Sequence, residues 1–323
     1  MKIGVIGVGN MGRHHVRLYK ELGVLCCISD INGELAKQVS EKYGCNYYED
    51  YNEMLNNEKL DAVSVAVPTS LHKKVSIDVI SKGVNLLIEK PIAENLKDAK
   101  DIIDAAKERG LKLMVGHVER FNPAVQRLKK ILDEGKLGKV TSVVAKRVGL
   151  FPSQVRDANI IIDLAVHDID VMNFLFGSCG KIVGSSGGVA LDAGREDYAH
   201  IMLDYNGIGN FIQVNWITPI KIRQLSITGT KGHAELNYLT QELVLYETNY
   251  EKEFDNYGDF IVKFGVPAKI RMEFPHEEPL KNELKEFISC LKENRQPQVD
   301  PENAFNVLSL AIDALGKIRG YTL

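Results

Sequence analysis

The sequence lacks any apolar run approaching the roughly 18 residues that a membrane-spanning helix needs. It also lacks an acidic or basic tail, and its formal net charge at pH 7 is only −3, so we expect neither nucleic acid nor a membrane surface as a partner. The apolar stretch at 1–7 is too short and too rich in glycine for a signal peptide. These absences favour a cytoplasmic protein.

Cysteine is scarce as well, with five residues in the whole chain and none in CxxC spacing. An odd number without that spacing argues against a disulfide framework and against a zinc site. We therefore interpret them as reduced or buried thiols and predict no bound metal.

The 323 residues suffice for two domains, and 45% hydrophobic with 26% charged residues is ordinary for a globular protein. From 2 to 117, short apolar runs alternate with amphipathic stretches, which predicts a parallel sheet covered by helices on both faces. The expected strands are 2–6, 24–29, 62–66, 85–88 and 112–115, and the expected helices lie near 10–22, 33–43, 72–82 and 95–109.

After Arg120 the pattern changes. Apolar and polar residues alternate over 199–205 and 210–216, and tight glycine-containing turns follow such segments, which indicates an antiparallel sheet with one covered face. The other expected elements are helices near 123–133, 160–176, 279–293 and 301–319, and a strand near 139–149.

The motif Gly7-Val8-Gly9-Asn10-Met11-Gly12 follows the first strand and opens a helix. In this context Gly7 permits a tight turn, Gly9 lets the backbone approach a pyrophosphate, and Gly12 lets helix and strand pack closely. The N–H groups of the helix then receive the phosphates. The alternative is a glycine turn without a ligand.

Asp30 ends the second strand and is followed by Ile31. A carboxylate there accepts hydrogen bonds from ribose hydroxyls and repels a 2′-phosphate, and no arginine follows directly, so we predict NAD rather than NADP. A helix N-cap is the compatible structural alternative.

Two further strands end in Pro68-Thr69-Ser70-Leu71-His72 and in Glu89-Lys90-Pro91. Ligands of open α/β sheets bind beyond the carboxyl ends of the strands, so both segments are expected to face the cleft. From its position alone, Lys90 is more typical of a solvated surface cation, and the apolar helix at 160–176 is what favours a role in the cleft.

The expected helix 160–176 is almost wholly apolar and must be buried nearly all round. Asp163, His167 and Asp170 are spaced to share one stripe, whereas Asp168 projects from the other side. Three interpretations of these polar residues stay open. They could form a hydrogen-bonded network in the core, or a carboxylate and the histidine could bind a metal, although no further ligand lies at a suitable spacing. The third is acid–base catalysis by a histidine whose pKa is set by burial and a neighbouring carboxylate.

Taken together, these motifs resemble the Gfo/Idh/MocA oxidoreductase family over essentially the whole chain. The resemblance implies an α/β fold with an N-terminal Rossmann domain, 1–120, that binds NAD. It also implies an α+β domain, 121–323, with a large open, mainly antiparallel sheet for substrate binding and oligomer contacts. The implied cofactor contacts are Gly7, Gly9, Asn10, Met11, Gly12, Asp30, Ile31, Pro68, Thr69, His72, Glu89 and Lys90.

The family resemblance also implies that Lys90, Asp163 and His167 surround the nicotinamide. We assign His167 as the general base on a secondary hydroxyl, Lys90 as the cation that stabilises developing alkoxide charge, and Asp163 as the group that orients them. The reverse assignment, with Lys90 as the base, stays open. One departure is visible, because the family often has three glycines where this chain has Arg156-Asp157-Ala158-Asn159.

Segments 116–123, 163–170 and 216–219 most resemble the nucleotide-sugar dehydrogenases of the family. They imply NAD-dependent oxidation of a UDP-N-acetylhexosamine at C3. An inositol or aldose dehydrogenase of the same family is the second interpretation, and a non-catalytic dinucleotide-binding sensor is the third.

Lys221 and Arg223 lie two residues apart, so on an extended strand they would share a face and could hold the substrate's diphosphate. Solvated cations on a strand edge are the alternative. The further expected substrate contacts are Arg120, Asn122, Arg147 and His167. The alternating strands over 199–216 have a second face that is partly apolar, and so large an apolar surface is seldom left in contact with water. We therefore predict a homo-oligomer, dimer or tetramer, packed through this sheet.

Overall fold

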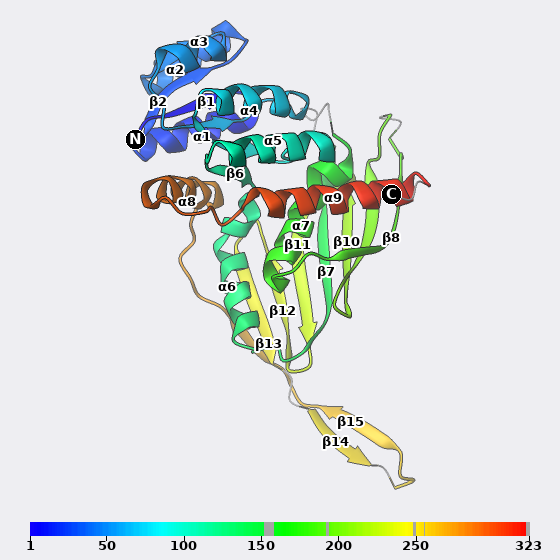
Figure 1. The fold of residues 1–323 in the computed structure, drawn as a ribbon. Coiled ribbons are helices and arrows are strands. Elements are labelled where there is room, and N and C mark those ends of the chain that lie inside the picture. The colour runs from blue at the N-terminus through cyan, green and yellow to red at the C-terminus, as the bar shows by residue number, and fades with distance from the viewer. Residues whose placement is uncertain (152–157, 192–193, 248–249, 255, 321–323) are drawn as a thin grey trace. The chain divides into compact units, whose positions relative to one another are not determined.

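The computed structural model describes residues 1–151, 158–191, 194–247, 250–254 and 256–320. Contacts along the chain divide it into two compact units, both drawn in Figure 1. The first unit comprises 1–118 with 278–309, and the second comprises 119–277 with 310–323. Each unit is built around its own sheet.

The first unit contains a six-stranded parallel sheet with the order β3-β2-β1-β4-β5-β6. Every residue of β1, β4 and β6 is buried, as in a parallel sheet that helices cover on both faces. The strands are β1 (Ile3–Ile6), β2 (Leu25–Ser29), β3 (Asn46–Tyr48), β4 (Ala62–Val65), β5 (Asn85–Glu89) and β6 (Leu113–Gly116).

Three helices of this unit begin where short polar side chains cap them. Asn32, Asp50 and Asn95 each accept a backbone N–H from the first turn that follows. The helices are α1 (Asn10–Glu21), α2 (Gly33–Tyr43), α3 (Tyr51–Asn57), η1 (Thr69–Leu71), α4 (His72–Ser81), α5 (Leu96–Glu108), α8 (Pro279–Glu293) and the first part of α9 (Pro301–Ile318). Ion pairs join α8 to α1, between Glu21 and Lys281 (3.1 Å) and between Arg17 and Glu278.

The second unit contains an eight-stranded sheet with the order β16-β13-β12-β11-β7-β10-β9-β8. Its neighbours are antiparallel except for β7 and β10, which run parallel. The strands are β7 (Val140–Leu150), β8 (Lys181–Gly188), β9 (Tyr198–Tyr205), β10 (Ile208–Asn215), β11 (Ile217–Gly229), β12 (Gly232–Asn237), β13 (Glu242–Glu247) and β16 (Ala268–Arg271). A separate hairpin pairs β14 (Tyr250–Phe254) with β15 (Phe260–Phe264).

One face of this sheet is covered by α6 (Pro123–Asp133) and by α7 (Val166–Phe176), which the short helices η2 (Val118–Phe121) and η3 (Ile161–Ala165) precede (Figure 1). The strands alternate accordingly: Ala199, Ile201 and Leu203 of β9 are buried, whereas Met202 is 53% exposed. Asn206 and Gly207 both have positive φ, as a tight two-residue turn between β9 and β10 requires.

The fold class expected from the sequence is confirmed, including the parallel sheet and the mainly antiparallel one. The sequence patterns missed the short elements β3 and α3, the β14–β15 hairpin and the parallel pairing of β7 with β10. Within the ranges that the structure describes, no helix is long and apolar enough to cross a membrane.

Candidate active site

The turn between β1 and α1 holds the glycine motif in the first unit. Gly7 has a φ of +85°, and a Cβ on it would lie 2.6 Å from the carbonyl oxygen of Ala66. A Cβ on Gly12 would lie 1.8 Å from the carbonyl oxygen of Gly7, so neither position tolerates a side chain. Gly9 faces open space, with no atom within 4 Å of its Cβ position. Open backbone at a helix N-terminus is the geometry that receives a pyrophosphate.

A cavity of about 570 Å³ opens beside this turn. Its size is within the range of roughly 300–1,000 Å³ that is typical of small-molecule sites. Ile31 at its edge is 95% exposed, which leaves an apolar surface for a flat ring. The lining includes the expected cofactor contacts Gly7, Gly9, Asp30, Ile31 and Pro68, together with Glu49, Tyr51, Leu71 and Lys74.

The carboxylate of Asp30 is fixed at this cavity by two backbone groups. Its Oδ2 accepts the N–H of Val8 at 2.8 Å, and its Oδ1 accepts the N–H of Asn32 at 2.9 Å. The remaining lone pairs are available to ribose hydroxyls, and the fixed charge opposes a 2′-phosphate. The cap of α2 is Asn32 and not Asp30. These features together fit a dinucleotide without a 2′-phosphate.

His72 opens α4 and is buried between two loops. Its Nδ1 lies 2.8 Å from the carbonyl oxygen of Pro91, and its Nε2 lies 3.0 Å from that of Val67. Burial lowers the pKa of His72, although both carbonyl oxygens act in the opposite direction. Both ring nitrogens therefore face backbone groups, and the ring joins the loop after β4 to the loop after β5.

Lys90 follows β5 and is half-buried. The preceding residue, Glu89, is buried, and its Oε1 lies 2.9 Å from Nε2 of His15 on α1. The Glu89 carboxylate, an expected cofactor contact, thus interacts with α1. His15 was not predicted from the sequence. The sequence does contain a clue, because His15 lies on the same face of α1 as the buried residues Gly12, Val16 and Tyr19.

In the second unit, the expected helix 160–176 begins with a π-helical turn, η3, before α7 starts. Asn159 opens it, because its Oδ1 accepts the N–H groups of Ile161 and Ile162. Asp163 lies within the wide turn and His167 in the first turn of α7, and both are half-buried. A π-turn of this kind is frequent at functional sites, and it changes the angle between residues spaced four apart.

The other two carboxylates of this helix belong to buried ion pairs. Asp168 accepts two hydrogen bonds from Arg147 of β7, at 2.8 and 3.0 Å, and Asp170 pairs with Arg120 at 2.7 Å. Burial opposes the charge of Arg147, but the Asp168 and Glu119 carboxylates outweigh it and raise the pKa of the guanidinium. The core-network interpretation thus applies to Asp168 and Asp170, whereas Asp163 and His167 lie outside these two pairs.

Several expected substrate contacts have partners inside the second unit. Arg120 and Arg147 are held by the carboxylates of α7, and Arg147 also lies 4.8 Å from the ring centre of Tyr238. Asn122 caps α6 by accepting the N–H of Ala124 and donates to the carbonyl oxygen of Tyr238. All three side chains are thus held by groups of their own unit, and their roles as substrate contacts stay predictions.

The two cations of β11 differ from these. Lys221 is exposed and lies where the register between β11 and β7 shifts. Arg223 is half-buried and donates to the carbonyl oxygen of Val148 at 2.6 Å. Burial, followed by the charge of Arg147, lowers the pKa of Arg223 to about 10, so it is still a cation at neutral pH.

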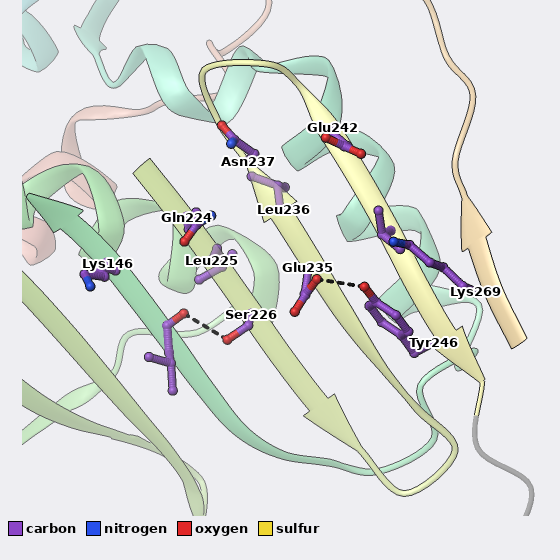
Figure 2. A pocket seen from close by; sticks show the side chains of 12 residues that line it. Lys146, Gln224, Leu225, Ser226, Glu235, Leu236, Asn237, Glu242, Tyr246 and Lys269 are labelled. Atoms are coloured by element: carbon purple, nitrogen blue, oxygen red, sulfur yellow. Dashed lines mark hydrogen bonds between the residues drawn. The ribbon is translucent and has the colours of Figure 1, made fainter. Parts of the chain in front are cut away.

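The face of the eight-stranded sheet opposite α6 carries a polar groove of about 370 Å³ (Figure 2). Ala234 and Leu236 of β12 are buried, whereas Glu235 between them is exposed and accepts a hydrogen bond from Tyr246 at 3.0 Å. The groove also presents Lys146, Gln224, Ser226, Asn237, Glu242 and Lys269. Sequence alternation indicated the exposed face, but not that this part of it is polar.

Among the described residues, one group of side chains is close enough to share a metal ion. Ligand atoms of Cys26, Cys27 and Glu58 all lie within 4.8 Å of one another, and the Cys26 thiol donates to Glu58. Burial raises the pKa of both thiols, which keeps them protonated, whereas a metal ligand is a thiolate. We interpret the group as hydrogen-bonded thiols of β2.

Comparisons with known proteins extend this picture. Residues 1–117 match a family model described as an oxidoreductase family with an NAD-binding Rossmann fold, and 125–235 match the GFO/IDH/MocA C-terminal domain. The chain is 30% identical to a UDP-N-acetylglucosamine 3-dehydrogenase of Acidithiobacillus ferrooxidans, over 99% of this chain and 98% of that protein. It is 26% identical to a scyllo-inositol 2-dehydrogenase (NAD(+)) of Bacillus subtilis, over 99% of this chain and 94% of that protein.

Solved structures give the same result for the fold. A structure of the Acidithiobacillus ferrooxidans UDP-N-acetylglucosamine 3-dehydrogenase aligns with a TM-score of 0.84 at 25% identity, covering 99% of this chain and 98% of that one. A levoglucosan dehydrogenase in complex with NADH and levoglucosan aligns with a TM-score of 0.84 at 20% identity, covering 99% of this chain and 97% of that one. Of the segment that departs from the family's glycine run, Arg156 and Asp157 lie outside the described residues.

Proposed function

Because this chain belongs to the Gfo/Idh/MocA oxidoreductase family, we propose that it is an NAD-dependent sugar dehydrogenase that oxidises C3 of a UDP-N-acetylhexosamine. The observation that carries the proposal is the end-to-end likeness to a UDP-N-acetylglucosamine 3-dehydrogenase. The glycine turn, the adjoining cavity and the fixed carboxylate of Asp30 support the cofactor part of it.

The reaction removes a proton from a secondary hydroxyl while the carbinol carbon loses its hydrogen with two electrons. NAD, when bound, supplies the oxidant that accepts that hydrogen and both electrons. A ring nitrogen of His167 takes the hydroxyl proton, the ammonium group of Lys90 stabilises the developing alkoxide, and Asp163 orients the proton acceptor. A positioned base of this kind contributes about 100- to 10,000-fold.

The diphosphate of the substrate requires cations that other groups of the chain have not neutralised. Arg120 and Arg147 face buried carboxylates, so we assign this role to Lys221 and Arg223. The Arg223 guanidinium donates to backbone carbonyl oxygens and retains further N–H groups for a phosphate.

A substrate panel tests the proposal. The purified protein is mixed with NAD and with UDP-N-acetylglucosamine, free N-acetylglucosamine or myo-inositol, and NADH formation is followed by its absorbance. We expect turnover of the UDP-sugar and little with the other two. Lys221→Ala should raise the KM for the UDP-sugar, whereas Lys231→Ala, which alters an exposed lysine in the turn after β11, should not. Equal oxidation of the free sugar would contradict the nucleotide-sugar assignment.

A second candidate is an inositol dehydrogenase. The likeness to the Bacillus subtilis scyllo-inositol 2-dehydrogenase supports it, because that match also covers 99% of the chain. The same panel separates the two functions, since turnover of an inositol without turnover of the UDP-sugar would favour this candidate.

A further inference from the structure

The surroundings of Lys90 include a buried pair of hydrogen-bonded side chains, His15 and Glu89. His15 of α1 is fully buried, and its Nε2 lies 2.9 Å from Oε1 of Glu89. An ionised carboxylate only accepts hydrogen bonds, so this ring nitrogen carries the proton. The other carboxylate oxygen, Oε2, accepts the backbone N–H of Lys90 at 3.3 Å.

The neighbouring strand has a glycine, Gly116, beside this carboxylate. Glu89 of β5 lies opposite Gly116 of β6 in the parallel register. A Cβ on Gly116 would lie 3.2 Å from all three carboxyl atoms of Glu89, so even an alanine would press on the group. The glycine on β6 and the histidine on α1 therefore fix the carboxylate from two separate elements.

The buried Glu89 carboxylate is kept ionised by the groups around it. Burial acts to raise the pKa of Glu89, but the hydrogen bond and charge of His15, together with the charge of Lys90, hold it below its usual range. Tyr19 of α1 and His72 of α4 also interact electrostatically with Glu89. The Tyr19 hydroxyl bonds Ser64, the His72 ring bonds two backbone carbonyl oxygens, and Glu283 of α8 acts in turn on Tyr19.

We propose that His15 and Glu89 are positioning residues for Lys90, setting the place and electrostatic surroundings of its ammonium group. The inference rests on the proposed function, because it takes Lys90 to be the cation that stabilises the alkoxide. His15 and Glu89 are both buried and act through the lysine, so neither needs to touch the substrate.

The first experiment is a double-mutant cycle. His15→Gln and Glu89→Gln should each lower kcat by about tenfold to 100-fold, and His15→Gln should leave the KM and the affinity for NAD unchanged. In a Lys90→Ala background, His15→Gln should cause no further loss, because the group through which it acts is gone. The matched control is His14→Gln, which alters the exposed neighbouring histidine and should leave kcat unchanged.

The cycle separates positioning from a merely structural role. If His15→Gln lowers kcat by the same factor with and without Lys90, the loss comes from the fold and the inference is wrong. Thermal melts of each variant identify one that fails to fold, and Gly116→Ala then serves as a milder disturbance of the same carboxylate. If Lys90→Ala itself keeps normal turnover, the proposed function fails in its assignment of Lys90.

A second measurement needs no substrate. The rate at which an amine-acylating reagent modifies Lys90 at fixed pH is read by mass spectrometry, relative to the other lysines. Glu89→Gln removes the neighbouring negative charge, so the amine should react faster than in the unmodified protein, whereas His14→Gln should leave the rate unchanged. An unaltered rate in Glu89→Gln would overturn the inference whatever the protein oxidises.

Discussion

At the scale of single residues, Asp30 acts through a carboxylate that two backbone N–H groups hold in place. Because the charge cannot turn away, we expect Asp30→Ser to raise the preference for NADP over NAD, measured as the ratio of kcat/KM values, by at least about tenfold, or about 1.4 kcal/mol. Glu34→Ser, an exposed carboxylate in the first turn of α2, is the control. Equal use of both cofactors by the unmodified protein would contradict this role of Asp30.

His167 and Lys90 are each expected to act mainly in the transition state. His167→Ala and Lys90→Ala should therefore lower kcat by about 100-fold or more, with the affinity for NAD nearly intact. Steady-state kinetics and equilibrium NAD binding measure the two effects separately. Near-normal turnover in both variants would mean that the proton chemistry belongs to other residues.

At the scale of elements, α7 is anchored by two buried arginine–carboxylate pairs, Arg147–Asp168 and Arg120–Asp170. Removing one partner leaves a buried charge without compensation, so Arg147→Met should lower the free energy of unfolding by about 3–5 kcal/mol. The double variant Arg147→Met with Asp168→Leu should recover much of that loss. Chemical denaturation measures both, and a single variant as stable as the unmodified protein would contradict the anchoring role.

Sequence patterns predicted most elements because apolar periodicity reports burial directly. The helices at 33–43, 123–133 and 279–293 have the same bounds in the structure as in the prediction. Partners far apart in the sequence left no such pattern. Nothing local to Glu89 indicates His15, which lies 74 residues away, and the carboxylates of α7 could not be assigned to arginines or to chemistry before the strands were in register.

The same limit applies to the candidate site. The glycine motif and Asp30 were predictable because one βαβ unit contains both the residues and their geometry. Arg120 and Arg147 look like anion-binding groups in the sequence, and only the tertiary structure reveals that carboxylates already hold them. The π-turn at η3 has no signal of its own in the sequence, which is mostly apolar there.

At the scale of the whole molecule, the exposed face of the large sheet is divided. One part is the polar groove of Figure 2, and the other presents Val144, Val183, Met202 and Phe211 around a shallow hollow. Met202 and Phe211 lie opposite each other on β9 and β10 and are 53% and 36% exposed. An apolar surface of this kind typically marks an interface.

We therefore expect a homo-oligomer, a dimer or a tetramer, that uses this sheet. Introducing charge with Met202→Lys and Phe211→Lys should shift the protein toward monomer in sedimentation velocity at micromolar concentration. Leu239→Lys, which alters an exposed leucine in the turn between β12 and β13, is the control and should leave the distribution unchanged. An unmodified protein that sediments as a monomer would contradict the expectation.

The proposed reaction removes hydrogen from C3 of a UDP-N-acetylhexosamine. The most direct test supplies UDP-N-acetylglucosamine that carries deuterium at C3 only, together with NAD, and determines by mass spectrometry where the deuterium goes. We expect one deuterium atom in the reduced nicotinamide and none left at C3 of the product. Reduced nicotinamide without deuterium, or no reduction with any UDP-N-acetylhexosamine, would contradict it.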